Sequence, residues 1–210
     1  MTRTRFNPLD KKNLGISVAD AVIDEPLESL ATLEPFEGAG IYALYYSGDF
    51  ELYADMVSFC GREGIEWPIY VGKAIPPGSR TGQFGLDPDP KQALYKRLCE
   101  HRSSINAASN LAVEDFGVRA LLVDDIWIPL GEALLISRFC PPWNTCVQGF
   151  GIHHPGGGRA GQAPSEWDVL HPGRSWVKSL TGVAAPTPEI LSRLQEHIAA
   201  TCLTLSRRKV

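Results

Sequence analysis

A cysteine cluster is lacking in this chain, although it has five cysteines. Nowhere do two of them stand at the Cys-x-x-Cys spacing; they lie at Cys60, Cys99, Cys140, Cys146 and Cys202. An odd, widely spaced set argues against both a disulfide framework and a structural zinc site. We therefore expect reduced thiols that are mostly buried.

Long hydrophobic runs are also lacking. No stretch approaches the ~18 apolar residues that a membrane-spanning helix needs. The N-terminus, Met1–Asn7, is polar and no apolar segment follows it, which argues against a signal peptide. These absences predict a cytoplasmic protein without a membrane partner.

A basic excess, the usual mark of a nucleic-acid-binding protein, is missing too. The chain has 20 Lys and Arg residues against 24 Asp and Glu residues, a formal net charge of −4, so its composition gives no support to DNA binding. Basic residues nevertheless gather at 91–102 and again at Arg207–Lys209. Because acidic residues elsewhere mask a local basic face in the sum, the net charge does not exclude a nucleic-acid function.

What the chain does have is the composition of a packed globular protein, with 44% hydrophobic residues. Its 210 residues suit one hydrophobic core, and no Gly/Ser-rich linker divides it. We expect a single domain over 1–210. It would comprise an N-terminal arm (1–37), a core (38–147) and a C-terminal elaboration (148–210).

Hydrophobic periodicity and turn residues predict the secondary structure. Runs rich in β-branched and aromatic residues predict strands at 40–46, 68–73 and 118–123. Helices are predicted at 49–61, 92–105, 130–139 and 188–201, and more loosely at 18–30. Proline and glycine make 74–90 a long loop, and long loops in compact domains tend to be functional.

One carboxylate, Glu132, interrupts an otherwise apolar segment, Leu130–Ile136, that is predicted to form a helix buried nearly all round. An ionised carboxylate is costly in such surroundings unless it is paired or binds a metal ion. The alternative is a glutamate in the first turn, stabilised by the helix dipole. Both interpretations remain open from the residues alone.

Arg97 and His101 stand four residues apart on a predicted helix and therefore share one face. Two adjacent donors at this spacing suit a phosphate or a pentacoordinate phosphorane. Taken alone, the pair is better explained as part of a solvated basic face. The strand tyrosines, taken alone, are ordinary sheet aromatics; they are Tyr42, Tyr45, Tyr46 and Tyr70.

In combination, these residues resemble the GIY-YIG nuclease superfamily. Gly40-Ile41-Tyr42 and Tyr70-Val71-Gly72 look like its two half-motifs, each on a strand, and Arg97-x-x-x-His101 looks like its helical signature. Glu132 falls where the superfamily places a metal-binding glutamate, and Asn144 follows at a short interval. The order of the set is far more specific than any three-letter motif in it.

The resemblance is closest to the GIY-YIG type II restriction endonucleases that cut the palindrome CCGCGG. It covers roughly 38–182 and includes PIYVGKAIP, PPWN, GFGIHHPGGGR and SEWDVLHPGR. It implies an α+β fold with a small mixed or antiparallel three-stranded sheet flanked by helices. Loop insertions are expected at 49–67 and 74–90, besides the N- and C-terminal elaborations.

The resemblance also implies a mechanism. Glu132 would hold one Mg²⁺, which Mn²⁺ can replace, and Arg97 would stabilise the non-bridging oxygens. Tyr42 is the candidate general base, with its pKa lowered by Lys73 or by the metal assembly. Tyr70 and His101 would orient the water or share the proton, and His101 is an equally good base. Asn144 would position the substrate or Glu132.

A palindromic double-stranded DNA site calls for a homodimer that cuts each strand once, and for side chains outside the core that read base edges. Arginine contacting guanine is the expected pairing for a GC-rich site. Two loops and the residues near them carry the candidates for base reading, which are Arg80, Gln83, His153, His154, Arg159 and Arg174. For the glycine-rich loop, the alternative interpretation is a plain flexible connector. A cognate DNA methyltransferase is expected in the host.

Three other functions compete with this one. A structure-selective or mobile-element nuclease of the same superfamily would normally carry a separate DNA-binding domain, and the chain has no room for one. A non-catalytic DNA-binding protein on the same fold would be expected to lose Glu132, Arg97 or a motif tyrosine, and all are present. A zinc-binding module lacks clustered ligands.

Overall fold

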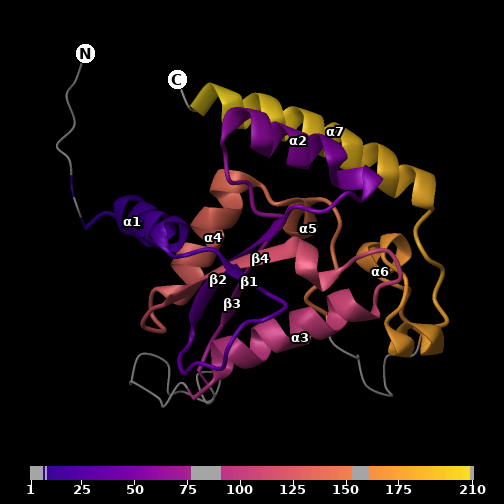
Figure 1. The fold of residues 1–210 in the computed structure, drawn as a ribbon, viewed down its shortest axis with the longest axis horizontal. Coiled ribbons are helices and arrows are strands. Elements are labelled where there is room, and N and C mark those ends of the chain that lie inside the picture. The colour runs from indigo at the N-terminus through magenta and orange to yellow at the C-terminus, as the bar shows by residue number, and fades with distance from the viewer. Residues whose placement is uncertain (1–6, 8, 77–90, 153–160, 209–210) are drawn as a thin grey trace.

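The computed structural model describes residue 7 and residues 9–76, 91–152 and 161–208. At its centre lies an antiparallel four-stranded sheet in the order β1-β4-β2-β3 (Figure 1). Its strands are β1 (Glu28–Ser29), β2 (Gly40–Tyr46), β3 (Tyr70–Ala74) and β4 (Phe116–Leu122). The α+β class and the three longer strands are as expected. The sheet gains a fourth strand because the arm adds the two-residue β1 beside β4.

The principal helices are α1 (Lys11–Asp24), α2 (Ala54–Glu63), α3 (Ala93–Ala107), α4 (Ile128–Phe139) and α7 (Thr187–Arg208). Two short helices were not expected, α5 (Pro142–Thr145) and α6 (Glu166–Leu170). The prediction of a helix at 18–30 was wrong in position. The Asp10 side chain caps the backbone of Lys12, so the helix begins earlier, and the chain after Asp24 is extended.

Helices α4 and α1 are layered on one face of the sheet (Figure 1). Two glycines allow this close approach: a Cβ on Gly131 of α4 would lie 2.3 Å from Ile41 Cδ1 of β2, and one on Gly15 of α1 would lie 1.6 Å from Leu134 Cδ1. Contacts this short do not occur, so a larger residue would require the Ile41 or Leu134 side chain, or the helix itself, to shift. Glycine at both positions allows the helices to pack this closely.

The other face of the sheet is covered by α3 and by an aromatic core. Trp143 of α5 is 1% exposed and packs against Phe116 of β4 and against Phe150, which follows α5. Trp167 of α6 is fully buried and contacts the same Trp143 edge-on. These large rings pack together on this side of the sheet, where the tyrosine of the first half-motif, Tyr42, also points.

The insertion at 49–67 and the C-terminal elaboration meet in an outer layer. Helix α2, from the insertion, lies beside the long C-terminal helix α7 (Figure 1). Met56 and Phe59 of α2 are buried, as are Ile190 and Leu194 of α7. The two segments are far apart in the sequence, and apolar contact between their helices holds them together.

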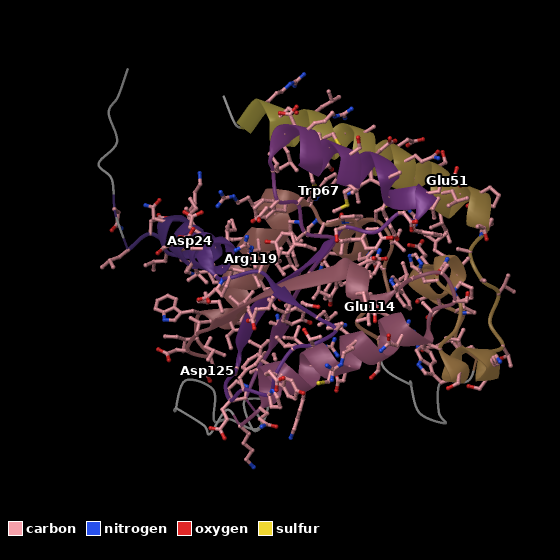
Figure 2. All side chains as sticks on the ribbon, viewed as in Figure 1. Asp24, Glu51, Trp67, Glu114, Arg119 and Asp125 are labelled. Atoms are coloured by element: carbon pink, nitrogen blue, oxygen red, sulfur yellow. The ribbon has the colours of Figure 1, made fainter. Side chains whose placement is uncertain are left out.

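Arg119 of β4 joins three parts of the chain (Figure 2). It donates to the Glu25 carbonyl of the arm and pairs with Glu66 of the insertion, while its guanidinium lies 5.7 Å from the centre of the Tyr45 ring. Its side chain is 12% exposed, so these contacts are partly shielded from water. The arm and the insertion are thus anchored to the same strand of the sheet.

All five cysteines are free, as expected. Only Cys146 among them is buried, and the other four are partly exposed, so the prediction of mostly buried thiols was wrong. In the portion of the chain that the structure describes, no helix combines the length and the apolar character needed to cross a membrane.

Candidate active site

The two half-motifs meet at one point of the sheet. The pairing of β2 with β3 places Tyr42 directly opposite Gly72. The Tyr42 ring is fully buried, and a Cβ on Gly72 would lie 2.3 Å from the Tyr42 hydroxyl oxygen. The glycine of the second half-motif therefore makes the space that the tyrosine of the first one occupies.

Helix α3 brings His101 to this tyrosine. The Tyr42 hydroxyl lies 2.5 Å from His101 Nε2, a short hydrogen bond between two buried side chains. The Phe150 ring stacks on the imidazole, with ring centres 4.4 Å apart and planes at 16°. Tyr70 completes the cluster, because its ring contacts Tyr42, His101 and Phe150. The His101 ring is thus held by packing and by one strong polar contact.

Arg97 stands one helical turn before His101 and faces the same cluster. Its Nη2 donates to the Gly151 carbonyl at 2.9 Å, and its Nη1 pairs with Glu100 at 2.8 Å. Its charge also acts on the hydroxyls of Tyr42 and Tyr70. The guanidinium is therefore held beside Tyr42 and Tyr70, and Arg97 does not merely belong to a solvated basic face of the helix.

Burial raises the pKa of Tyr42 well above its ordinary value, and the neighbouring Tyr70 raises it further. Arg97 lowers this pKa, though by less than burial raises it. The positive charge that acts directly on Tyr42 is that of Arg97, and the expected lowering of this pKa by Lys73 or by a metal ion stays a prediction. The pKa of Tyr70 is also raised, again chiefly by burial. Without substrate, both tyrosines are neutral phenols.

Lys73 instead pairs with Glu132. Its Nζ donates to Glu132 Oε2 at 2.6 Å, with the two side chains 34% and 20% exposed. Helix α4 is exposed along its outer side, at Ala133, Ser137 and Arg138, so the prediction of a helix buried nearly all round was wrong. The helix lies on the surface of the sheet, and Glu132 stands at the border between its buried and exposed sides.

The two groups of side chains approach β3 from different sides. Lys73 is paired with Ile41 in the sheet and reaches α4, whereas Gly72 is paired with Tyr42, whose hydroxyl reaches α3. They are close enough for the Glu132 charge to raise the pKa of both Tyr42 and Tyr70. The site therefore spans the edge strand of the sheet.

Glu132 has the properties of a ligand for a hard cation. Its Oε2 accepts from Lys73, and from the described residues its Oε1 receives no hydrogen bond. Within those residues no three His, Cys, Asp or Glu side chains gather at one point. An ion at Glu132 would thus rely on one carboxylate together with water and phosphate oxygens, a donor set that Mg²⁺ accepts.

Asn144 of α5 binds the backbone of the edge strand β3. Its side-chain oxygen accepts from the Val71 amide at 2.7 Å, and its side-chain nitrogen donates to the Val71 carbonyl at 2.8 Å. The amide thus pairs with the free edge of β3 as a further strand would. The amide still has a second N–H and a second oxygen lone pair, so the expectation that it positions substrate or Glu132 stays a prediction. It fixes the strand that carries Tyr70 and Lys73.

Arg174 has a different role from the one expected. It was expected to read DNA, yet it is 5% exposed and its guanidinium binds Asp168 and three backbone carbonyls. No N–H group of this guanidinium is left for a base edge. The other expected DNA-reading side chains lie outside the described residues; they are Arg80, Gln83, His153, His154 and Arg159.

Two site residues were missed from the sequence, Phe150 and Gly151. Phe150 holds the His101 ring, and the Gly151 carbonyl holds Arg97. A Cβ on Gly151 would lie 2.8 Å from the Tyr70 hydroxyl, so glycine is needed there. The available signal was Gly149-Phe-Gly151, an aromatic residue between two glycines shortly after Asn144.

The sheet, the opposed half-motifs and the histidine and arginine of α3 define a GIY-YIG nuclease core. A comparison with protein families agrees: the model described as the Eco29kI GIY-YIG domain matches residues 34–198, well over half of the chain. The chain therefore belongs to the Eco29kI GIY-YIG family, a family of type II restriction endonucleases. A search among curated proteins found no match.

Proposed function

We propose that this protein is a type II restriction endonuclease that hydrolyses double-stranded DNA at a GC-rich palindrome, CCGCGG, leaving 5′-phosphate and 3′-hydroxyl ends. Family membership supports the nuclease class. The observation that carries the chemistry is the short hydrogen bond between Tyr42 and His101 beside the Arg97 guanidinium. The sequence and the ends rest on the resemblance of the chain to enzymes of that specificity.

The first requirement of hydrolysis is a group that takes a proton from water. Tyr42 is a neutral phenol, because burial raises its pKa, so it cannot begin as the base. His101 Nε2 is its hydrogen-bond partner at 2.5 Å. We infer a relay in which the attacking water gives a proton to the Tyr42 oxygen while the Tyr42 proton passes to His101. This makes His101 the base and Tyr42 the group that contacts water.

The second requirement is compensation of the negative charge that builds up on the phosphoryl group. Arg97 is suited to this because its guanidinium is already held by the Gly151 carbonyl. Tyr70 lies against both Tyr42 and His101, so its hydroxyl can orient the water or the phosphate. Lys73 offers a further cation on the α4 side of the strand.

The third component is a divalent cation, Mg²⁺ with Mn²⁺ as a substitute, held by Glu132. The carboxylate supports this assignment, because it is partly exposed and its Oε1 receives no hydrogen bond from the described residues. When bound, the ion supplies charge neutralisation at the scissile phosphate and at the leaving oxygen. Lys73 now holds the same carboxylate in place, and thereby keeps it directed at the edge of β3.

A palindromic site further implies a homodimer, in which each subunit cuts one strand, and a host DNA methyltransferase that protects the same sequence. The base-reading side chains are proposed to lie in the segments 77–90 and 153–160, outside the described residues. Arginine contacts to guanine, from Arg80 or Arg159, are the expected means of reading a GC-rich site.

The test is cleavage of plasmids of known sequence with Mg²⁺, followed by mapping of the fragment ends. We expect discrete bands that end at one palindrome, linear product without accumulating nicked circles, and resistance after methylation of the mapped site. A smear without discrete bands would favour a structure-selective or non-specific nuclease. A mapped site other than CCGCGG would refute the proposed sequence and leave the nuclease intact.

Glu132→Gln is the variant that tests the proposed metal site. It should bind the same DNA in a gel-shift assay and lose cleavage by on the order of a thousandfold, because stabilisation worth several kcal/mol disappears with the metal ligand. Glu189→Gln, an exposed glutamate of α7, is the control and should cleave normally. An unchanged rate in Glu132→Gln would remove Glu132 from the metal site.

A further inference from the structure

The backbone carbonyls of four consecutive residues after α5, Gly149 to Ile152, accept hydrogen bonds from arginines. Arg174 donates to those of Gly149, Phe150 and Ile152, at 3.1, 3.2 and 3.0 Å. The remaining carbonyl, that of Gly151, accepts from Arg97. One short segment, all four of whose carbonyls accept from arginine, thus connects a structural arginine with a site arginine, and we name it the carbonyl bridge (Gly149–Ile152).

Arg174 is itself held rigidly. Its Nε and Nη2 bind the two Asp168 carboxylate oxygens at 2.6 and 2.7 Å, in the bidentate arrangement that is strongest for this pair. The two side chains are 4% and 1% exposed. The guanidinium also lies over the Trp167 and Trp176 rings. Its five N–H donors therefore have five acceptors, two from Asp168 and three from the carbonyl bridge.

The carbonyl bridge touches the site at two places. Its Gly151 carbonyl fixes Arg97, and its Phe150 ring stacks on His101. Any shift of this backbone would move the acceptor of Arg97 and the ring that orients His101 Nε2 toward Tyr42. Such coupling matters because a misplacement of about 1 Å costs on the order of a hundredfold in rate.

We propose that Arg174 is a positioning residue for DNA cleavage, acting through the carbonyl bridge on Arg97 and His101 together. This inference rests on the proposed function, since it assigns both side chains to catalysis. It differs from a DNA-reading role, for which Arg174 has no free donor. It also differs from a purely structural role, which predicts loss of stability without a change in the site.

Arg174→Lys is the main variant. Lysine keeps the charge beside Asp168, but its single ammonium cannot reproduce five donors in a planar fork. We expect kcat to fall about ten- to a hundredfold, with KM for DNA changing by less than about threefold. The opposite pattern, an unchanged kcat with weakened or less specific DNA binding, would overturn the proposal. So would an unchanged kcat and KM in a variant that merely melts earlier.

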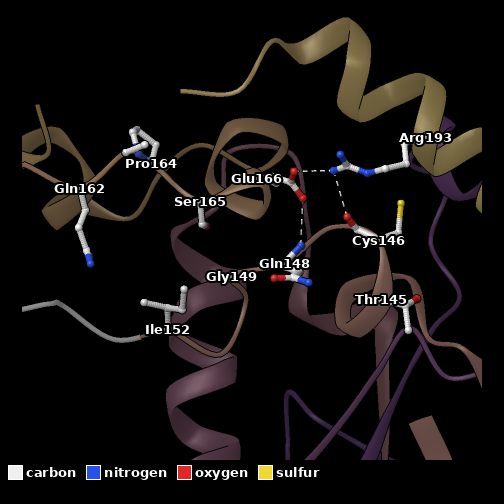
Figure 3. A pocket seen from close by; sticks show the side chains of 11 residues that line it. Thr145, Cys146, Gln148, Gly149, Ile152, Gln162, Pro164, Ser165, Glu166 and Arg193 are labelled. Carbon is white, nitrogen blue, oxygen red and sulfur yellow. Dashed lines mark hydrogen bonds and ion pairs between the residues drawn. The ribbon is translucent and has the colours of Figure 1, made fainter. Parts of the chain in front are cut away.

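Arg193→Lys is the matched control. Arg193 of α7 also pairs with a carboxylate, that of Glu166, and donates to a backbone carbonyl, that of Cys146 (Figure 3). The partners in these two contacts are Glu166 and Cys146, neither of which belongs to the carbonyl bridge, although Gly149 and Ile152 line the same pocket. This variant should keep both kinetic constants, and a loss equal to that of Arg174→Lys would make the effect non-specific and overturn the proposal.

A readout independent of cleavage separates this inference from the proposed function. The chain has five histidines, so nitrogen-15 labelling of histidine gives few ring signals, and His101→Asn identifies the relevant one. We expect the His101 ring signal to shift or broaden in Arg174→Lys and to stay in place in Arg193→Lys. Should wild-type protein fail to cut DNA, the proposed function fails, while this measurement still decides the coupling.

Phe150→Leu keeps the test decisive if Arg174→Lys does not fold. It leaves Arg174 and its carbonyl partners intact and removes the ring that stacks on His101. The His101 signal should shift and kcat should fall at nearly constant KM. An unchanged His101 signal in this variant would overturn the proposal, because the carbonyl bridge would then not influence the position of the His101 ring.

Discussion

His171, directly after α6, is a buried base whose titration should destabilise the fold in mild acid. It is fully buried between Tyr53 and Asn110. Trp143 donates its indole N–H to the Tyr53 oxygen, so the Tyr53 hydroxyl donates to His171 Nε2. His171 Nδ1–H then donates to the Asn110 side-chain oxygen, which fixes the neutral tautomer. A proton on Nε2 would face the hydroxyl proton of Tyr53, and this donor would lose its acceptor.

Burial lowers the pKa of His171 from 6.5 to about 3. Between these values the unfolded chain takes up a proton at this residue and the folded chain does not, so the free energy of unfolding falls as the pH falls below 6.5. The loss relative to pH 7.5 is about 1.4 kcal/mol at pH 5.5 and about 2.7 kcal/mol at pH 4.5. Losses of this size are a substantial part of the stability of a domain.

The assay is urea unfolding, followed by tryptophan fluorescence, at pH 7.5, 5.5 and 4.5 in wild type and His171→Gln. Glutamine keeps an acceptor for Tyr53 and does not titrate in this range. The stability advantage of wild type over the variant should therefore shrink by the amounts given above. An advantage that stays constant across the three pH values would refute the assignment of a neutral, buried His171.

Two substitutions test the tyrosine pair. Tyr42→Phe keeps the ring and removes the hydroxyl that contacts His101. The cleavage rate should therefore fall by a factor of about 10²–10⁴ while DNA binding is unchanged. Cleavage near the wild-type rate would refute the relay and leave His101 to act on water directly. Gly72→Ala places a methyl 2.3 Å from the Tyr42 oxygen, so both cleavage and melting temperature should fall. The control is Gly61→Ala in α2, where no atom lies within 4 Å and stability should rise by up to about 1 kcal/mol; a Gly72→Ala variant as stable and active as wild type would contradict this packing.

The part of the site that follows from local sequence was predictable. Strand β2 was predicted at 40–46 and lies there, since a run of β-branched and aromatic residues between glycines marks a buried strand. The helical spacing of Arg97 and His101 likewise placed both on α3. Their partners were less accessible, because Phe150 reaches His101 from nearly fifty residues later, and no local pattern reports that distance.

Arg174 shows why residue type alone misleads. An arginine near a glycine-rich loop in a suspected DNA-binding protein is usually read as a surface cation, because buried charges are rare. Its true environment depends on Asp168, Trp167 and Trp176, which surround it only after folding. Their closeness in the sequence was the available signal. The prediction for the helix of Glu132 erred in the opposite sense. Its apolar residues indicated burial nearly all round, whereas one side of the helix is exposed to solvent.

The position of the site across an edge strand couples its two halves through charge. Anionic Glu132 raises the pKa of Tyr42 from the α4 side, and Arg97 lowers it from the α3 side. Any cation that screens Glu132 therefore shifts the balance toward easier loss of the Tyr42 proton to His101. Lys73 provides such a cation already, at 2.6 Å. The carboxylate proposed to hold the metal ion and the base of the proton relay are consequently one electrostatic unit, although different helices support them.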